Sequence, residues 1–223
     1  SDRAIAPDIK RKIALFCNVA DANVIACPDS ASIYDVPHVL YREGADARLI
    51  EHLNIWSREP QLEVWDRLHD AIHNPDGAVT IAIVGKYVDL TDSYKSLNEA
   101  LQHAGYSFRK RVELLFVDSE AVEADGVDAH LEGVDGILVP GGFGKRGTEG
   151  KIAAVGRART GKIPFFGICL GMQLAVVEFA RNVAGIRDAH SREFDLQTES
   201  AVIDLMADQR EIVDKGGSMR LGA

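Results

Sequence analysis

The sequence predicts an α/β fold in which a parallel sheet carries helices on both faces. From Ala78 onward, short apolar runs rich in β-branched residues alternate with stretches of helical periodicity. Such alternation implies right-handed crossovers between parallel strands. The chain has 223 residues, of which 46% are hydrophobic and 26% charged. This composition is typical of a globular protein with material for a sizeable core.

The bulk properties also exclude several classes of function. The formal charge is −9 and the basic residues are scattered, which argues against nucleic-acid binding, since that requires clustered lysine and arginine. No apolar run approaches the roughly 20 residues of a membrane helix, and no secretory signal is recognisable, so a cytoplasmic location is expected. Three widely spaced cysteines, Cys17, Cys27 and Cys169, predict neither a disulfide framework nor a metal site.

The first third of the chain has its own pattern. Residues 12–19 form a short apolar run that is interpreted as a buried strand, with Cys17 as a small core residue. Helices are predicted near residues 36–53 and 59–73, the second from apolar residues at helical spacing. The turn-forming residues 74–77, Asn-Pro-Asp-Gly, then mark the best domain boundary. Two domains, 1–74 and 75–223, are therefore expected.

The second domain is expected to alternate strands and helices. Strands are predicted at residues 78–84, 112–117, 136–139 and 164–169, and helices at 93–104, 151–159 and 171–183. Ligands of such sheets bind beyond the carboxyl ends of the strands. The loops that follow Val84, Val139 and Ile168 are therefore the places to look for a site.

One of these loops carries a candidate nucleophile. Residues 167–171 read Gly-Ile-Cys-Leu-Gly, an arrangement in which glycines flank a nucleophile held in a tight strand-to-helix turn. The start of the following helix adds partial positive charge, which favours a thiolate at Cys169. The alternative is a buried cysteine between two glycines that serve only close packing.

A glycine-rich loop follows another strand. Residues 140–144 read Pro-Gly-Gly-Phe-Gly, and its backbone N–H groups, together with that of Leu170, can converge on a developing oxyanion. The alternative is a tight turn that needs positive φ angles.

Longer strings connect these motifs to a known family. The sequence from Pro140 to Ile152, Pro-Gly-Gly-Phe-Gly-Lys-Arg-Gly-Thr-Glu-Gly-Lys-Ile, and the later Gly-Ile-Cys-Leu-Gly-Met-Gln resemble the class I glutamine amidotransferases, and among them the CTP synthase family. Matches in the same order continue at residues 32–37, 84–87, 92–96, 191–194 and 216–222.

The resemblance implies a reaction in which ATP activates UTP and ammonia from glutamine converts it to CTP. It implies ATP and Mg²⁺ as requirements of the longer protein, GTP as an activator, and a homotetramer. The residue roles that it implies are a nucleophile, two oxyanion donors and three contacts to the glutamine substrate: Cys169; Gly142 and Leu170; Phe143, Gln173 and Glu193.

The resemblance also implies that the chain is an internal part of a longer enzyme. Residues 1–74 would be the C-terminal part of an ammonia-ligase (synthetase) domain with a linker, and 75–223 an amidotransferase domain truncated at its C-terminal end. The phosphate-binding string G-x-x-x-x-G-K-S/T is absent from the sequence, so no cofactor is expected here. The family's catalytic His and Glu would follow Ala223, and the 223 residues alone are expected to be inactive.

Several features keep alternative interpretations. His130-Leu131-Glu132 has the His-x-Glu spacing of the family but is interpreted as chance, and His190 as a surface histidine rather than a partner of the thiolate. Lys86 and Lys95 are interpreted equally as surface charges or nucleotide contacts, and residues 216–222 as a mobile segment or a plain glycine-rich tail. Two other functions are compatible with the tight strand-to-helix turn at residues 167–171, called the elbow below. One is a cysteine peptidase or small-molecule hydrolase, and the other is a non-catalytic binding module.

Overall fold

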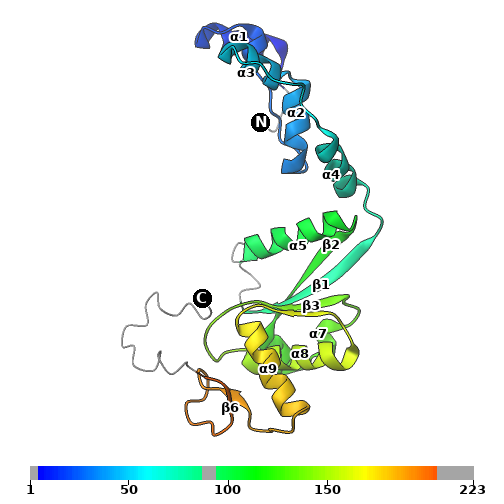
Figure 1. The fold of residues 1–223 in the computed structure, drawn as a ribbon, viewed down its shortest axis with the longest axis vertical. Helices are drawn as coiled ribbons and strands as arrows, with labels where there is room; N and C mark the ends of the chain where they lie inside the picture. The colour runs from blue at the N-terminus through cyan, green and yellow to red at the C-terminus, as the bar shows by residue number, and fades with distance from the viewer. Residues whose placement is uncertain (1–4, 87–93, 205–223) are drawn as a thin grey trace. The chain divides into compact units, whose positions relative to one another are not determined.

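The computed structural model describes residues 5–86 and 94–204 and divides the chain into two compact units (Figure 1). The first unit extends to Asp76 and includes Tyr106–Arg109; the second comprises Gly77–Gly105 and the chain from Lys110. The division falls inside the turn at residues 74–77 that the sequence marks as a boundary.

The described part of the first unit contains helices and no strand. Its elements are α1 (Pro7–Cys17), η1 (Asp21–Asn23), η2 (Ile33–Asp35), α2 (Val36–Arg42), α3 (Ala45–Leu53) and α4 (Glu63–His73). Ala14 and Ala71 are the buried hydrophobic residues of this described part. The apolar core of the unit is therefore small.

The predicted strand at residues 12–19 is wrong. These residues lie in and just beyond α1, which begins at Pro7 with an aspartate in its first turn and ends where Asn18 adopts φ 53°. Proline at a first helical position and an acidic first turn are helix-start signals, and they lie outside the apolar run that suggested a strand. Cys17 is exposed rather than part of a core.

The other two helices of this unit differ from their predicted limits. The helix expected at 36–53 is split into α2 and α3 by Gly44, whose φ of 72° a helix cannot accommodate. The helix expected from residue 59 begins at Glu63; Pro60 disfavours helical geometry at Glu59, the residue before it.

The second unit contains the predicted parallel sheet. Strands β1 (Ala78–Gly85), β2 (Arg111–Asp118), β3 (Gly136–Val139) and β4 (Phe165–Gly167) lie in the order β2-β1-β3-β4, and all neighbours are parallel. The central strand β1 pairs along its full length with β2, from Ala78 with Arg111 to Gly85 with Asp118. The carboxyl ends of the strands therefore lie along one edge.

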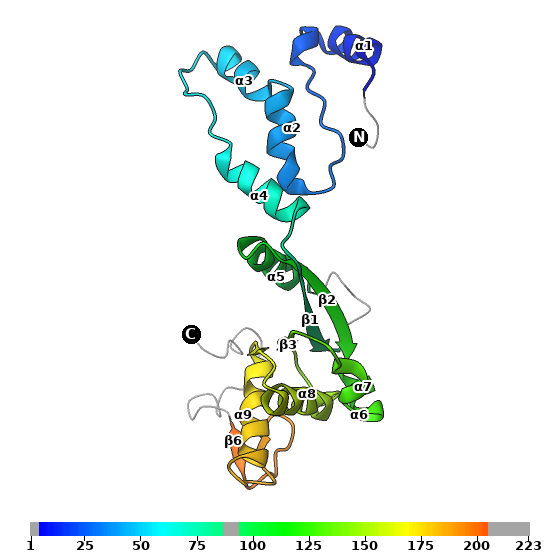
Figure 2. The same cartoon turned by 90° about the vertical axis from the view of Figure 1, so that its right-hand side faces the viewer.

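Helices cover both faces of this sheet, as predicted. The helices are α5 (Lys95–Ser107), α6 (Ser119–Asp125), α7 (Asp128–Leu131), α8 (Thr148–Gly161) and α9 (Leu170–Asn182). Figures 1 and 2 show α5 on one side of the sheet and α7 and α8 on the other. None of the helices in the described ranges is long and apolar enough to cross a membrane.

The main core lies between the sheet and α6, α7 and α8. It contains Ala82 and Val84 of β1, Ile137 and Val139 of β3, and apolar side chains of these helices. Ile83, between the two β1 residues, is also completely buried, because alternate residues of a strand face opposite sides.

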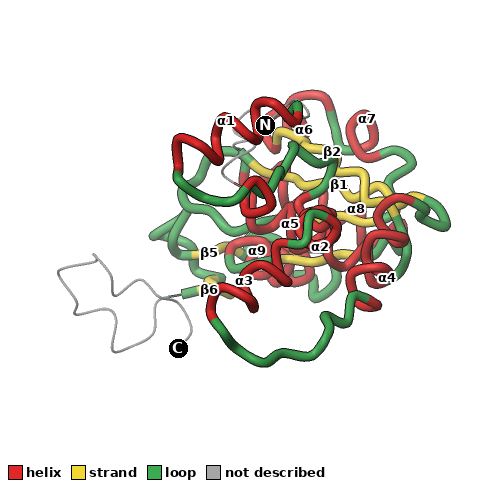
Figure 3. Tube along the Cα trace, turned by 90° about the horizontal axis from the view of Figure 1, so that it is seen from above, coloured by secondary structure: helices red, strands yellow, loops and turns green. Residues whose placement is uncertain are grey.

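A second, smaller sheet lies beyond α9. Strands β5 (His190–Ser191) and β6 (Ala201–Ile203) run parallel side by side (Figure 3). Phe194, from the connection between them, packs against the buried α9 residues Leu170, Leu174 and Val177. Strands this short leave no alternation in a sequence, which explains why they were not predicted.

Candidate active site

Cys169 occupies the turn between β4 and α9, with its side chain exposed. Its backbone has φ 51° and ψ −106°, a region that residues other than glycine rarely adopt. Strain of this kind persists only where the surroundings enforce it, and it is concentrated at functional sites. The structure therefore presents the cysteine as the motif predicts, and the alternative of a buried cysteine is wrong.

The flanking glycines enforce the turn. A Cβ on Gly167 would lie 2.5 Å from the carbonyl carbon of Gly171 and 2.6 Å from the Met172 nitrogen. A Cβ on Gly171 would lie 2.0 Å from the carbonyl oxygen of Val139, at the end of β3. Both obstacles are backbone, so neither can rotate away. The turn closes on itself and against β3 only because both positions lack a side chain.

The elbow also orients the beginning of α9. The N–H of Gly171 donates to the Ile168 carbonyl at 2.9 Å, and that of Gln173 to the Cys169 carbonyl at 3.1 Å. Leu170 is the first residue of the helix, so its N–H has no acceptor one turn earlier. It is a donor available beside the nucleophile.

The glycine-rich loop lies against the elbow. A Cβ on Gly141 would be 3.4 Å from the Cβ of Cys169, and one on Gly142 would be 3.8 Å from Cδ2 of Leu170. These contacts bring together the nucleophile and the two residues that the resemblance implies as oxyanion donors.

Lys86, at the end of β1, holds this loop in place. Its Nζ donates to the carbonyl oxygens of Phe143 and Gly144, both at 2.9 Å. Burial lowers the pKa of Lys86, and the nearby Arg146 lowers it further, against the opposing effect of Glu120. Of the two interpretations of Lys86, neither included this contact. The carbonyl that accepts this hydrogen bond from Lys86 lies 57 residues later in the chain. No local sequence pattern predicts such a contact.

The three implied glutamine contacts surround the same loop and helix. Glu193 is exposed, and its Oε1 accepts from the Gly144 N–H at 3.5 Å. Gln173 is half-buried in the first turn of α9, and Phe143 is 62% exposed. The structure thus brings Glu193 to the loop from a distant segment, and it leaves the Phe143 ring open to a ligand.

A hollow of about 340 Å³ borders the loop and the elbow. It is lined by residues from the start of α5 and from both loops: Tyr94, Lys95, Ser96, Leu97, Pro140, Gly141 and Ile168. Sequence reasoning considered Lys95 but not Tyr94. A Cβ on Gly85 would lie 2.7 Å from the Tyr94 hydroxyl, so a glycine at the end of β1 was the available signal.

The candidate histidines are not partners of the thiol. Within residues 5–86 and 94–204, no histidine ring hydrogen-bonds to Cys169 Sγ. His190 is half-buried in β5; its Nδ1 accepts from the Ser191 N–H at 2.9 Å, and burial lowers its pKa. It is therefore less exposed than the predicted surface histidine. His130 contacts Asp125 just before β3, at the opposite edge of the sheet, in agreement with the interpretation of His-x-Glu as chance.

A buried lysine near this edge was not predicted. Lys151, in the first turn of α8, is 2% exposed. Its pKa is lowered to about 8, mainly by burial and also by the nearby Lys86, against the opposing effect of Asp118 and Glu123. Two lysines, with carboxylates around them, thus lie near this edge of the sheet.

Comparison with known proteins establishes the family. The class-I glutamine amidotransferase family model matches residues 89–223, and the chain belongs to this family. The model of the CTP synthase N-terminus matches residues 1–55. The resemblance drawn from the sequence motifs is thereby confirmed.

The curated relatives named CTP synthase match the whole chain. The protein of Syntrophus aciditrophicus is 55% identical over 100% of this chain and 41% of its own length. That of Geotalea uraniireducens is 56% identical over 97% of this chain and 41% of its own length. This chain therefore spans about two fifths of the relatives' length.

A solved structure supports the fold. The glutaminase domain of the Trypanosoma brucei CTP synthase, with bound acivicin, is 45% identical, with a TM-score of 0.56. The match covers 59% of this chain and 52% of that one. The flavodoxin-like α/β fold expected of the second unit is confirmed.

Proposed function

We propose that this chain carries the glutamine-hydrolysing site of a CTP synthase, with Cys169 as the nucleophile. The observation that carries the proposal is the exposed Cys169 on a strained elbow, with Gly141 of the neighbouring loop so near that a Cβ there would lie 3.4 Å from the Cβ of Cys169. Such an elbow presents a nucleophile to a carbonyl above the sheet edge.

The chemistry follows from these positions. The Cys169 thiolate attacks the side-chain amide carbon of glutamine, and a C–S bond forms as the carbonyl electrons move to oxygen. The backbone N–H groups of Leu170 and Gly142 stabilise this oxyanion. The C–N bond then breaks, the nitrogen takes a proton and leaves as ammonia, and water hydrolyses the thioester to glutamate. The described residues supply the nucleophile and donors; the proton donor is assigned, by resemblance only, to a His–Glu pair outside them.

The substrate's own charges suggest the remaining roles. The glutamine ammonium needs an anion, and the exposed Glu193 carboxylate beside Gly144 provides one. Gln173, one turn after Cys169, can hydrogen-bond to the substrate amide. The exposed Phe143 ring offers an apolar surface to the substrate's methylene groups.

The whole protein would use the ammonia to convert UTP to CTP. In this proposal residues 1–74 are the C-terminal part of the synthetase domain with a linker, and 75–223 the amidotransferase domain. The family match at 1–55 supports this assignment.

ATP, Mg²⁺, GTP and UTP would bind to the longer protein. No described residue is assigned to them, and the phosphate-binding string G-x-x-x-x-G-K-S/T does not occur in the 223 residues. A homotetramer in the cytoplasm completes the proposal by analogy with the family.

Covalent labelling tests the proposed site directly. The chain is treated with a chloroketone analogue of glutamine, with and without excess glutamine, and the modified residues are mapped by mass spectrometry. We expect labelling at Cys169 that glutamine suppresses. The exposed Cys17 and Cys27 serve as internal controls, because their labelling should not respond to glutamine.

Two variants sharpen the assignment. Glu193→Gln should weaken protection by glutamine about tenfold or more, because it removes the charge opposite the ammonium. Glu199→Gln, which changes an exposed glutamate with no role in the proposed site, should not. Equal labelling of all three cysteines, or protection by an unrelated amide as strong as that by glutamine, would contradict the proposal and favour a less selective hydrolase.

A further inference from the structure

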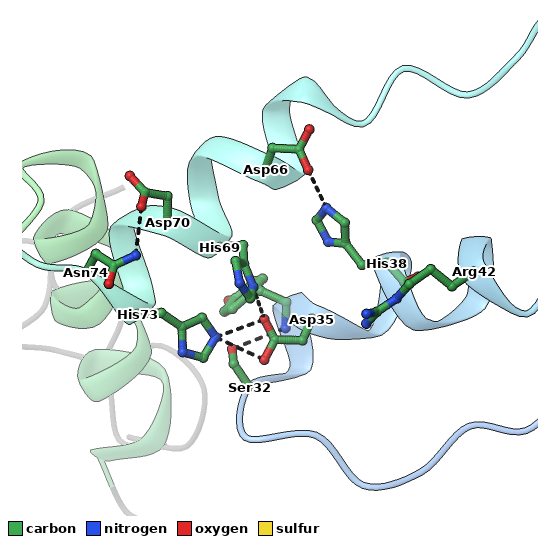
Figure 4. A network of polar contacts seen from close by, with 10 residues as sticks. Ser32, Asp35, His38, Arg42, Asp66, His69, Asp70, His73 and Asn74 are labelled. Carbon is green, nitrogen blue, oxygen red and sulfur yellow. Dashed lines mark hydrogen bonds and ion pairs between the residues drawn. The ribbon is translucent and has the colours of Figure 1, made fainter.

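Three metal-binding side chains converge in the first unit, far from the amidotransferase motifs in sequence. Asp35 ends η2, and His69 and His73 lie in the last two turns of α4. The Asp35 carboxylate lies 2.7 Å from His69 Nδ1, and 3.1 and 3.2 Å from His73 Nε2 (Figure 4). One candidate ligand atom from each residue lies within 4.8 Å of the other two.

The spacing of the histidines explains the convergence. Residues four apart lie on the same face of an α-helix, and the two imidazole rings are 4.3 Å apart between centroids. Asp35 approaches from a separate segment, 34 residues before His69. Figure 4 shows both rings directed at the same carboxylate. Two segments thus contribute to one site.

We propose that Asp35, His69 and His73 form a binding site for a divalent first-row transition metal, with Zn²⁺ as the best match. Two imidazole nitrogens and one carboxylate oxygen are a ligand set that such ions take, at about 2.0–2.2 Å. Tetrahedral geometry then places ligand atoms roughly 3.3 Å apart. The separation between Asp35 and His69 would need to widen by about 0.6 Å and that between Asp35 and His73 by about 0.1–0.2 Å, which rotation of the imidazoles can supply.

The exposure of the three side chains suits entry of an ion. Asp35 is 15% exposed, whereas His69 is 50% and His73 34% exposed. The carboxylate is therefore fixed from the protein side, and the imidazoles face water. A fourth position remains open to a water molecule or another ligand.

The position of the site gives the metal a structural role. Asp35 lies 34 residues before His69 and 38 before His73. A metal that binds ligands from two such segments stabilises the folded state, because the unfolded chain does not hold them together. An ion here would connect the segment before α2 to the end of α4 and stabilise both.

Simple ion pairing is the competing explanation, and the unit contains a matched example. His38 Nε2 lies 2.7 Å from Asp66 Oδ1, a histidine–carboxylate pair of the same length in which one histidine contacts the carboxylate; the His38 ring centroid lies 5.8 Å from that of His69. If pairing alone matters, His38 and His73 should respond alike to a metal. If the cluster is a site, only His69 and His73 should respond.

Metal titration distinguishes these cases. The three exposed cysteines of the full 223-residue chain are first alkylated, so that thiolates cannot bind the metal. Binding of Zn²⁺ is then measured by calorimetry, and that of Co²⁺ by its absorption spectrum, at about pH 7.5, where a free imidazole is mostly neutral. We expect one ion per chain. His69→Ala and His73→Ala should each weaken binding by about 100-fold or more, whereas His38→Ala should leave it unchanged.

A second measurement keeps the proposal testable if a variant loses structure. Alanine favours helix, so far-UV circular dichroism should show α4 retained in both variants. Zn²⁺ should raise the unfolding temperature of the unmodified sequence and of His38→Ala, and not that of His73→Ala. Absence of binding, or equal binding by all three variants, would overturn the site.

Discussion

The elbow glycine Gly171 offers the sharpest test of how the turn is built. Replacement by alanine would put a Cβ 2.0 Å from the Val139 carbonyl oxygen and 2.9 Å from its carbon. Both atoms belong to the backbone of a core strand, so relief requires β3 and the start of α9 to separate. Overpacking of this kind costs about 3 kcal/mol at the upper end of its usual range. The higher helix propensity of alanine offsets at most about 1 kcal/mol of this cost.

The expected net loss for Gly171→Ala is therefore about 2 kcal/mol, or about 4–8 °C in Tm for a unit of this size. Because the same shift moves the strained Cys169, its labelling by the glutamine analogue should slow by about tenfold or more. Gly161→Ala is the matched control: it also lies in a helix, but its new Cβ would meet only side-chain atoms at 3.4–3.5 Å. Urea unfolding and labelling kinetics are measured on both. A Gly171→Ala protein as stable and as reactive as the original would refute the steric account.

Two further expectations concern buried charges. Glu178 is 1% exposed and receives three hydrogen bonds from Arg159, whose side chain is 36% exposed. Arg159→Met should leave the buried carboxylate poorly paired and lower the free energy of unfolding by about 3 kcal/mol. Glu178→Met should lower it less, because the arginine can reach water. Urea unfolding compares them, and equal losses would contradict this asymmetry. The pKa of Lys151 is lowered from 10.5 to about 8, mainly by burial. Between pH 8 and pH 10.5 the unfolded chain therefore binds a proton at Lys151 that the folded chain does not, and the free energy of unfolding rises with pH. Lys151→Met should therefore be more stable than the original by up to about 3 kcal/mol at pH 7, with an advantage that shrinks toward pH 10; an advantage independent of pH would contradict the assignment.

The sequence predicted the second unit well because its signals are local. The strands at 78–84, 112–117 and 136–139 are largely apolar runs bounded by glycine, proline or charged residues, and the structure places them within one residue of those limits. The elbow was predictable for the same reason: five consecutive residues, 167–171, encode the whole turn.

The first unit was harder because its signals are weak. The apolar run at 12–19 has no partner strand and belongs to a helix whose start signal, Pro7, lies outside it. Gly44 adopts a positive φ and so divides a predicted helix. The neighbouring residues give no signal for this break. Few buried contacts in the described part of this unit reinforce the local pattern.

Contacts between distant segments were beyond sequence reasoning. Lys86 and Phe143 are 57 residues apart, and Asp35 and His73 are 38 apart. Only folding shows that these pairs meet. The expectation of no metal site rested on cysteine spacing, which does not test a set made of histidine and aspartate. The roles of Gly142, Leu170, Phe143, Gln173 and Glu193 stay predictions, supported by where the structure places them.

The conformation of the elbow depends on its two glycines, Gly167 and Gly171, whereas its reactivity depends on Cys169. A side chain at Gly167 or Gly171 would clash with backbone atoms, whereas the Cys169 side chain is exposed. A duplicated gene that loses hydrolysis is therefore expected to replace the cysteine and keep both glycines. In a survey of genomes, the glycine pair would identify the fold, and the residue between them would separate enzymes from inactive descendants.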